Sequence, residues 1–300
     1  MLVFPDTNSE ILCFLRNSQG RINTVPEYSS CMARIPPKSV PVDDISLAYN
    51  DLGSGYPLIL INGIASAMDT WNPPFLERLS GHYRIIVFDT RGTGYSGTSE
   101  KTYSISLFAR DTLRLMDVLG ISRAHILGFS MGASIAQELV FVAPERVDRL
   151  ILMAGTCGGK EAPGTDAEVW DRLLDKTGSV TEIACRMFSL IFPAGWLQSH
   201  DPFLYCPEVY EVTKSEEAAR QASAFSSWTG SYDRLNGIRS PTLILAGSED
   251  AVIAPQNSVI MSRQIPGAKL VLFPGAGHGL MYQCPDRLSA VIMDFLDGES

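Results

Sequence analysis

The first residue that could do chemistry is Ser130, which stands in the stretch Gly-Phe-Ser-Met-Gly. The apolar segment AHILGF before it predicts a strand, and MGASIAQELV after it predicts a helix, so the serine lies at a strand-to-helix turn. Gly128 and Gly132 leave room for a tight turn, because a Cβ at either position would clash. Gly-x-Ser-x-Gly in this context indicates a nucleophilic serine that stands clear of the sheet.

A serine hydroxyl is a poor nucleophile at neutral pH and needs a neighbouring base, and the chain has 4 histidines. His125 lies inside the strand that leads to the serine, and His82 falls at the amino end of another strand. His200 lies in a long region between strands. His278 follows the last predicted strand in the glycine-rich loop FPGAGHGL. A loop there reaches the carboxyl edge of a parallel sheet, beside Ser130, so His278 is the predicted base.

An imidazole base needs a carboxylate to fix its tautomer and to stabilise the imidazolium. The segment LILAGSEDAVI offers Glu249 and Asp250 in the loop after the preceding strand. Asp250 is the predicted partner, and Glu249 is interpreted as a solvated loop charge. The catalytic residues then follow the chain order Ser130, Asp250, His278, which predicts acyl transfer through a covalent serine intermediate.

The oxyanion of such a reaction needs hydrogen-bond donors that are already in place. The backbone N–H of Met131, at the start of the predicted helix, points to where the negative charge would form. The segment LILINGIASAMDTW leaves an earlier strand through Asn62 and Gly63. The backbone N–H of Ile64 in this segment is the second predicted donor.

A second glycine-rich turn, FDTRGTGYSG, follows the next strand. It is only superficially similar to a phosphate-binding loop, because the Lys-Ser or Lys-Thr pair of such loops is missing. Asp89 and Arg91 are therefore predicted to pair with each other and brace the loop rather than to take part in catalysis.

These groups need a sheet that brings the ends of its strands together. SVPVD and ISLAYNDLG flank the pair Asp43-Asp44 and predict a hairpin. Continuous apolar runs follow, typical of strands covered on both faces: PLILIN, YRIIVFD, AHILGF, DRLILMAG, PTLILAG and AKLVLFPG. Helical patterns such as SISLFARDTLRLMDVLG separate several of these runs, which predicts an α/β fold with a parallel sheet and right-handed crossovers.

One region breaks the alternation, because roughly 85 residues separate LILMAG from PTLILAG, far more than one crossover needs. Their mostly helical spacing and many aromatic residues favour an inserted helical cap over a second core unrelated to any site. The predicted division is a core of residues 37–156 and 240–300 and a cap of residues 157–239. The candidate lining residues of a substrate pocket are Asn62, Trp228, Ser231 and Tyr232. Core packing is the alternative for Trp228, Ser231 and Tyr232.

Residues 1–36 show no clear period and are predicted to form a poorly ordered N-terminal extension. A second methionine, Met32, opens MARIPPKSVPV, which is typical of a natural beginning. The stretch Met1–Cys31 is therefore interpreted as a dispensable extension or as the product of an upstream start codon.

Composition excludes several classes of protein. The 300 residues are 45% hydrophobic, which argues against disorder, and the net charge of -9 without a Lys/Arg cluster argues against a nucleic-acid partner. No apolar run approaches the ~20 residues of a membrane span, and the N-terminus lacks the basic segment of a signal peptide. The 6 cysteines form no Cys-x-x-Cys pair, which predicts no metal site and a reducing, cytoplasmic location.

From about Pro41 to Leu296 the chain resembles the α/β-hydrolase superfamily. The matching pieces are NGIA, FDTRGTGYS, GFSMG, GSEDAVI and GAGHG, in this order. The resemblance implies a mostly parallel eight-stranded sheet flanked by helices with an inserted helical cap, similar to small capped esterases and lactonases such as 3-oxoadipate enol-lactonase. Asn62 departs from the His of many members, and Ser130 argues against haloalkane dehalogenases and epoxide hydrolases, which need an aspartate nucleophile.

The resulting prediction is a serine hydrolase that cleaves a carboxylic ester or lactone of a small apolar or aromatic substrate, without metal or organic cofactor. The same three residues could also cleave a carbon–carbon bond of a dienone, form a peracid from hydrogen peroxide or hydrolyse a thioester. A non-catalytic receptor that uses the capped pocket is an alternative of another class. The residues leave the natural substrate, the pathway and the oligomeric state open.

Overall fold

A computed structural model describes residues 36–298 of the chain. The predicted N-terminal extension, apart from Pro36, and the hypothesis about Met32 lie outside the described residues.

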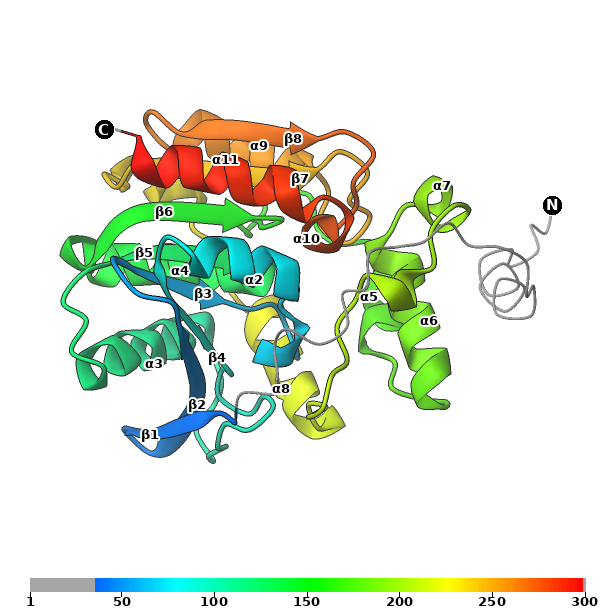
Figure 1. Ribbon diagram of the computed structural model, residues 1–300, viewed down its shortest axis with the longest axis horizontal. Coiled ribbons are helices and arrows are strands. Elements are labelled where there is room, and N and C mark those ends of the chain that lie inside the picture. Colours follow the sequence, from blue (N-terminus) through cyan, green and yellow to red (C-terminus); the bar gives the residue numbers. More distant parts are fainter. Residues whose placement is uncertain (1–35, 299–300) are drawn as a thin grey trace.

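One sheet of eight strands, in the order β1-β2-β4-β3-β5-β6-β7-β8, forms the centre of the described part (Figure 1). Strand β2 pairs antiparallel with β1 and with β4, and every pair from β4 to β8 is parallel, which confirms the predicted mostly parallel sheet. The strands are β1 (Lys38–Val42), β2 (Ile45–Leu52), β3 (Pro57–Ile61), β4 (Arg84–Phe88), β5 (Ala124–Phe129), β6 (Val147–Met153), β7 (Thr242–Gly247) and β8 (Lys269–Phe273).

The hairpin at the edge of the sheet lies where the sequence predicts it. Val42 pairs with Ile45 across a turn made of Asp43 and Asp44. Asp43 has a φ of 49°, a left-handed conformation that aspartate tolerates better than most residues.

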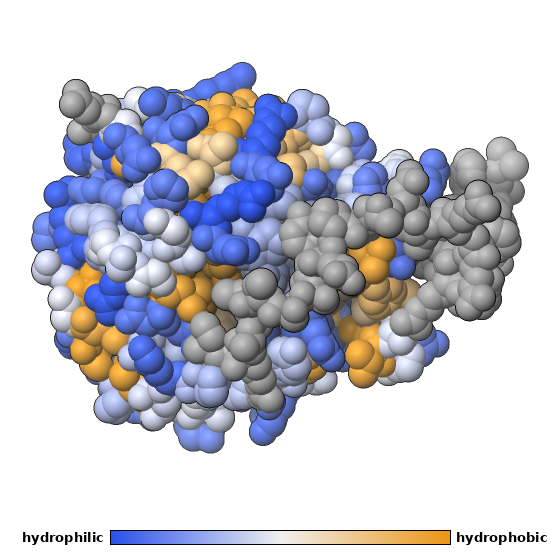
Figure 2. Space-filling model, in the orientation of Figure 1, coloured by the Kyte–Doolittle hydropathy of each residue, from blue (hydrophilic) through white to orange (hydrophobic). Residues whose placement is uncertain are grey.

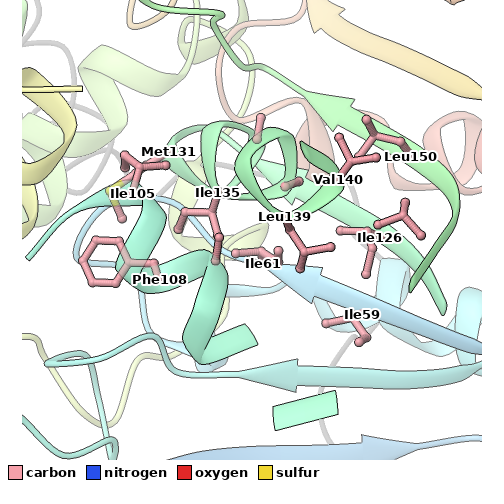
Figure 3. Close-up of a cluster of buried hydrophobic side chains, with 14 of the residues drawn as sticks. Ile59, Ile61, Ile105, Phe108, Ile126, Met131, Ile135, Leu139, Val140 and Leu150 are labelled. Atoms are coloured by element: carbon pink, nitrogen blue, oxygen red, sulfur yellow. The ribbon is translucent and has the colours of Figure 1, made fainter. Parts of the chain in front are cut away.

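Helices cover both faces of the sheet, which explains the continuous apolar runs of the central strands. In β3, Ile59 and Ile61 belong to one buried cluster, and Leu58 and Leu60 belong to another on the opposite face. The first cluster, part of which Figure 3 shows beneath α4, includes side chains from α3 (Ile105–Val118), α4 (Met131–Val142) and α9 (Gln256–Gln264). The second includes side chains from α2 (Pro73–Ser80), α10 (Leu280–Gln283) and α11 (Pro285–Asp297).

The segment between β6 and β7, here called the cap segment, is helical as its spacing predicts. Its helices α5 and α6 lie to one side of the sheet in Figure 1. Figure 2 shows hydrophobic surface near these helices and also at other places on this face, and Val180 at the start of α6 is 81% exposed. The cap helices are α5 (Ala167–Leu174), α6 (Val180–Ile191), α7 (Ala194–Leu197) and α8 (Ser215–Ser226), with short 3-10 turns at Pro202–Leu204 and Tyr232–Gly237.

Further 3-10 turns in the core lie at Met68–Thr70 and Pro144–Arg146. Within residues 36–298, no helix is both long and apolar enough to cross a membrane. The same residues contain no group of three or more His, Cys, Asp or Glu side chains suited to holding a metal ion.

One prediction about the glycine-rich turn after β4 is wrong, because Asp89 and Arg91 do not pair with each other. The buried Arg91 guanidinium donates to both carboxylate oxygens of Asp111 and of Asp44, over 2.8–3.1 Å. Asp89 accepts instead from the backbone N–H groups of Met68, at 2.6 Å, and Tyr95, at 2.8 Å. Burial raises the pKa of Asp89 to about 6, and these two amides oppose the rise. Both side chains brace loops, but through more distant partners.

His125, the histidine inside β5, is buried at the end of the sheet opposite Ser130. Its ring packs against Tyr56 and Tyr83, with centroids 4.6 and 6.0 Å away. Burial lowers the pKa of His125 to about 4, although the Asp148 carboxylate 3.3 Å from Nδ1 opposes that change. The neutral ring therefore stabilises the fold above an unfolded-state pKa of about 6.5, and this contribution is lost as the pH falls toward about 4.

We expect His125→Gln to remove this acid sensitivity. Between about pH 7 and about pH 4.5, the free energy of unfolding of the wild type should fall by about 2–3 kcal/mol more than that of the variant. Urea denaturation at several pH values measures the difference. His82→Gln, at an exposed histidine, is the matched control and should follow the wild type. Parallel pH profiles for the wild type and His125→Gln would show that His125 does not carry the effect.

Candidate active site

Ser130 occupies the strained turn that its sequence pattern predicts. It joins β5 to α4 with φ 56° and ψ -122°, a conformation that costs about 1–3 kcal/mol for a residue other than glycine. Its N–H donates to Met153 O at 2.9 Å, which ties the turn to β6. A Cβ on Gly128 would lie 2.2 Å from Gly132 O, and one on Gly132 would lie 2.1 Å from Ile61 O. Both flanking positions therefore require glycine.

Asp250 and His278 meet at the carboxyl ends of β7 and β8. The Nδ1 of His278 lies 2.8 Å from Oδ2 of Asp250, and both side chains are almost fully buried. The other carboxylate oxygen, Oδ1, accepts from the N–H groups of Val252 and Ile253, each at 2.9 Å. These amides fix the carboxylate, so it can hold one tautomer of the ring, with the proton on Nδ1. Glu249 is exposed, as the sequence predicts.

The loop of His278 lies beside the turn of Ser130. The imidazole packs against the ring of Phe129, the residue before the serine, with centroids 4.9 Å apart. No hydrogen bond between Ser130 Oγ and His278 is present among the described residues. Catalytic hydrogen bonds are often long or poorly aligned in ligand-free enzymes and tighten in the substrate complex. The arrangement leaves Nε2 as the ring nitrogen available to the serine.

The loop after β3 brings a backbone donor to the same place. A Cβ built on Gly63 would lie 3.1 Å from Ser130 Cβ and 3.5 Å from Ser130 Oγ. The amides on either side of Ile64 are occupied, since Gly63 N–H donates to Asn62 Oδ1 and Ala65 N–H donates to Gln221 Oε1. Ile64 N–H has no acceptor among the described residues and is free to bind an oxyanion.

The second candidate oxyanion donor is the backbone N–H of Met131. As the first residue of α4 it carries an N–H that has no partner within the helix. The partial positive charge of a helix N-terminus also favours an anion at this position. The N–H groups of Ile64 and Met131 thus stay the candidate oxyanion donors, and neither has a hydrogen-bond acceptor among the described residues.

A cavity of about 400 Å³ lies between the cap segment and the core. Its aromatic lining includes Trp170 of α5, Phe225 of α8 and Trp228. Ile253, another lining residue, donates its backbone N–H to Asp250, and the side chains of Ile253, Phe225 and Ile64 belong to one apolar cluster. The cavity therefore neighbours the loop of Asp250 through Ile253, and its lining does not include Ser130, His278 or Ile64.

Three of the candidate pocket residues have internal hydrogen-bond partners. Asn62 is buried within its own loop, where Nδ2 donates to Ala67 O and Thr70 Oγ1. Tyr232 packs against the core cluster and accepts from Gln264 Nε2 at 2.8 Å, and Ser231 donates to Gln137 Oε1 at 2.6 Å. The polar atoms of these three side chains are used in hydrogen bonds within the protein, which for Ser231 and Tyr232 agrees with the core-packing alternative. Trp228 alone of the four lines the cavity.

The sequence-based predictions missed two polar residues of the cap segment that contact the loop after β3, residues 62–67, here called the oxyanion loop. Gln221 binds Ala65 N–H, and Thr213 Oγ1 donates to Ala65 O at 3.0 Å. Neither residue belongs to a recognisable motif.

Comparison with known proteins agrees with this geometry. The profile described as the alpha/beta hydrolase family matches residues 58–291. A protein of Azorhizobium caulinodans, provisionally named carbamate hydrolase RutD, is 28% identical over 255 residues, covering 84% of this chain and 95% of that protein. The poly(3-hydroxyalkanoate) depolymerase of Ectopseudomonas oleovorans is 29% identical over 245 residues, covering 81% of this chain and 85% of the depolymerase.

A solved structure gives the same result in three dimensions. The enol-lactonase of Burkholderia xenovorans LB400 superposes with a TM-score of 0.75 at 25% sequence identity, covering 87% of this chain and 100% of that chain. The profile match extends from β3 to α11 and includes the turn of Ser130 and the loops of Asp250 and His278. The chain belongs to the alpha/beta hydrolase family.

Proposed function

We propose that the protein is a serine hydrolase that cleaves a carboxylic ester or lactone through an acyl-enzyme on Ser130. The observation that carries the proposal is the strained backbone of Ser130, φ 56°, placed between two backbone donors that lack partners among the described residues. Strain of this kind persists where the surrounding fold imposes it, and it clusters at active sites. The buried Asp250–His278 pair beside it supports the same function.

The reaction follows from the positions of these groups. Ser130 Oγ attacks the carbonyl carbon while His278 Nε2 accepts the hydroxyl proton, and the N–H groups of Ile64 and Met131 bind the oxyanion. Asp250 stabilises the imidazolium that forms. The imidazolium then protonates the leaving alkoxide, and the acyl group remains on Ser130. Water, deprotonated by His278, attacks the acyl-enzyme and releases the acid by the same steps.

The cavity supports a small apolar or aromatic substrate. Its volume of about 400 Å³ suits a ligand at the small end of the usual range. The rings of Trp170 and Phe225, stacked on each other with centroids 6.0 Å apart, are part of its lining. The likeness to an enol-lactonase supports lactones as substrates beside open-chain esters.

We also propose a cytoplasmic location. The four cysteines among the described residues are free thiols, which a reducing compartment would preserve.

A substrate panel tests the proposed function. p-Nitrophenyl esters of increasing acyl length, an aromatic lactone such as dihydrocoumarin, a thioester and a ring-cleavage dienone are each offered to the wild type and to Ser130→Ala. We expect turnover of short and aromatic esters or of the lactone, and only the background rate in Ser130→Ala. Turnover confined to the dienone or to the thioester would reject ester hydrolysis. Equal background rates in both proteins for all substrates would favour a receptor.

A further inference from the structure

The cap segment holds the oxyanion loop through one fully buried amide. Gln221, on α8, accepts the Ala65 N–H on Oε1 at 2.7 Å. Its Nε2 donates to Thr93 Oγ1 at 2.6 Å and to Arg91 O at 3.0 Å, both in the glycine-rich turn after β4. The Gln221 side chain thus connects the cap to both the oxyanion loop and the turn after β4. Its amide oxygen accepts one hydrogen bond and its amide nitrogen donates the others.

Ala65 needs this support because of its backbone conformation. Its φ of 52° lies in the left-handed region, which costs roughly 1–2 kcal/mol for a residue with a Cβ. Besides the bond to Gln221, Ala65 O accepts from Thr213 Oγ1 at 3.0 Å. Both backbone polar groups of Ala65 are therefore bound by side chains of the cap segment. Ile64, the predicted oxyanion donor, is the residue immediately before Ala65.

We propose that Gln221 and Thr213 are positioning residues through which the docked cap aims the Ile64 N–H at the oxyanion. This inference rests on the proposed function, because it needs an oxyanion to stabilise. When α8 is seated, Ala65 is held left-handed and the Ile64 N–H faces Ser130. Without the side chains of Gln221 and Thr213, Ala65 would lose both partners and the oxyanion site would lose its alignment.

The two bonds can be removed without detaching the cap. Glu217 and Arg220 of α8 bind the 98–103 segment independently, through Tyr103 Oη on Glu217 and through Arg220 to Ser99 O and Lys101 O. The Arg220 guanidinium also lies 3.8 Å from the centre of the Tyr103 ring. A change at Gln221 or Thr213 therefore tests the loop contact rather than the presence of the cap.

The test compares Gln221→Met and Thr213→Val with Thr242→Val. Thr242 is a buried threonine whose hydroxyl also donates to a backbone carbonyl, Ser240 O, but at the amino end of β7 away from the site. For each protein we measure kcat and KM on a p-nitrophenyl ester that the wild type hydrolyses. We also measure Ki for a trifluoromethyl ketone, which adds to a catalytic serine as a tetrahedral oxyanion.

We expect Gln221→Met to lower kcat by about 10–100-fold and Thr213→Val by about 3–10-fold, below the loss of about 10²–10³ for deletion of a whole donor. KM should stay within about two-fold, and Ki for the ketone should rise in parallel with the loss of kcat/KM. Thr242→Val should keep the wild-type kcat.

Several outcomes would overturn the inference. Wild-type kcat in folded Gln221→Met and Thr213→Val, or a change confined to KM, would show that the cap does not position the donor. If Gln221→Met does not fold, Thr213→Val decides by the same criteria. The failure of the proposed function is distinguishable, since it would show as a wild type without any turnover that depends on Ser130.

Discussion

Ser130→Ala is expected to lower kcat on a p-nitrophenyl ester by about 10⁴–10⁶-fold. The alanine cannot form the acyl-enzyme, and only the oxyanion donors and the pocket remain to accelerate direct attack by water. The protein should stay folded, because the alanine removes one oxygen from a turn whose backbone bond to Met153 is retained. Initial rates of ester hydrolysis, with thermal denaturation in parallel, measure both effects.

Ser134→Ala is the matched control for this variant. Ser134 lies on the same helix, α4, is fully buried, and has no hydrogen-bond partner for its hydroxyl among the described residues. Its removal should leave kcat within about two-fold of the wild type. A Ser130→Ala protein that kept more than about a tenth of the wild-type activity would exclude the serine as the nucleophile.

Asp250→Asn is expected to lower kcat by about 10⁴-fold with little change in KM. In the wild type, one carboxylate oxygen of Asp250 faces His278 Nδ1 and the other accepts from the backbone N–H groups of Val252 and Ile253. The amide of asparagine has the same shape, but its NH₂ group must replace one of these two oxygens. The ring then loses its fixed tautomer and the imidazolium loses its counter-charge. Steady-state kinetics measure the loss.

Glu249→Gln tests which of two adjacent carboxylates, Glu249 or Asp250, is the partner of His278. Glu249 is exposed, whereas Asp250 is buried against the imidazole. We expect Glu249→Gln to retain the wild-type kcat. A large loss in Glu249→Gln together with near-normal activity in Asp250→Asn would reverse the assignment of the acid.

Much of the fold follows from local patterns in the sequence. Apolar runs such as AHILGF predict buried strands because helices on both faces leave no polar side, as the two clusters around β3 show. The positions of Ser130, Asp250 and His278 follow from the same rule, because loops after parallel strands gather at one edge of the sheet. Asp250 and His278 meet there although 28 residues separate them.

The polar contacts between distant segments could not be predicted in this way. Arg91 pairs with Asp111 and Asp44, which lie 20 and 47 residues away, rather than with the nearby Asp89. Asn62 and Tyr232 use their polar atoms inside the fold, although their sequence positions equally suit a pocket. Gln221 accepts a hydrogen bond from Ala65 N–H although 156 residues separate the two. Such contacts depend on how distant segments, the cap and the core among them, pack against one another. The spacing of hydrophobic residues along the chain does not predict that packing.

The most direct test of the account is a peptide mass map after reaction with a fluorophosphonate, which phosphonylates an activated serine and loses fluoride. The account predicts one adduct, on the peptide that contains Ser130, with no adduct in Ser130→Ala and much slower labelling in Asp250→Asn. An enzyme that turns over esters while Ser130 stays unmodified and another residue carries the adduct would contradict it.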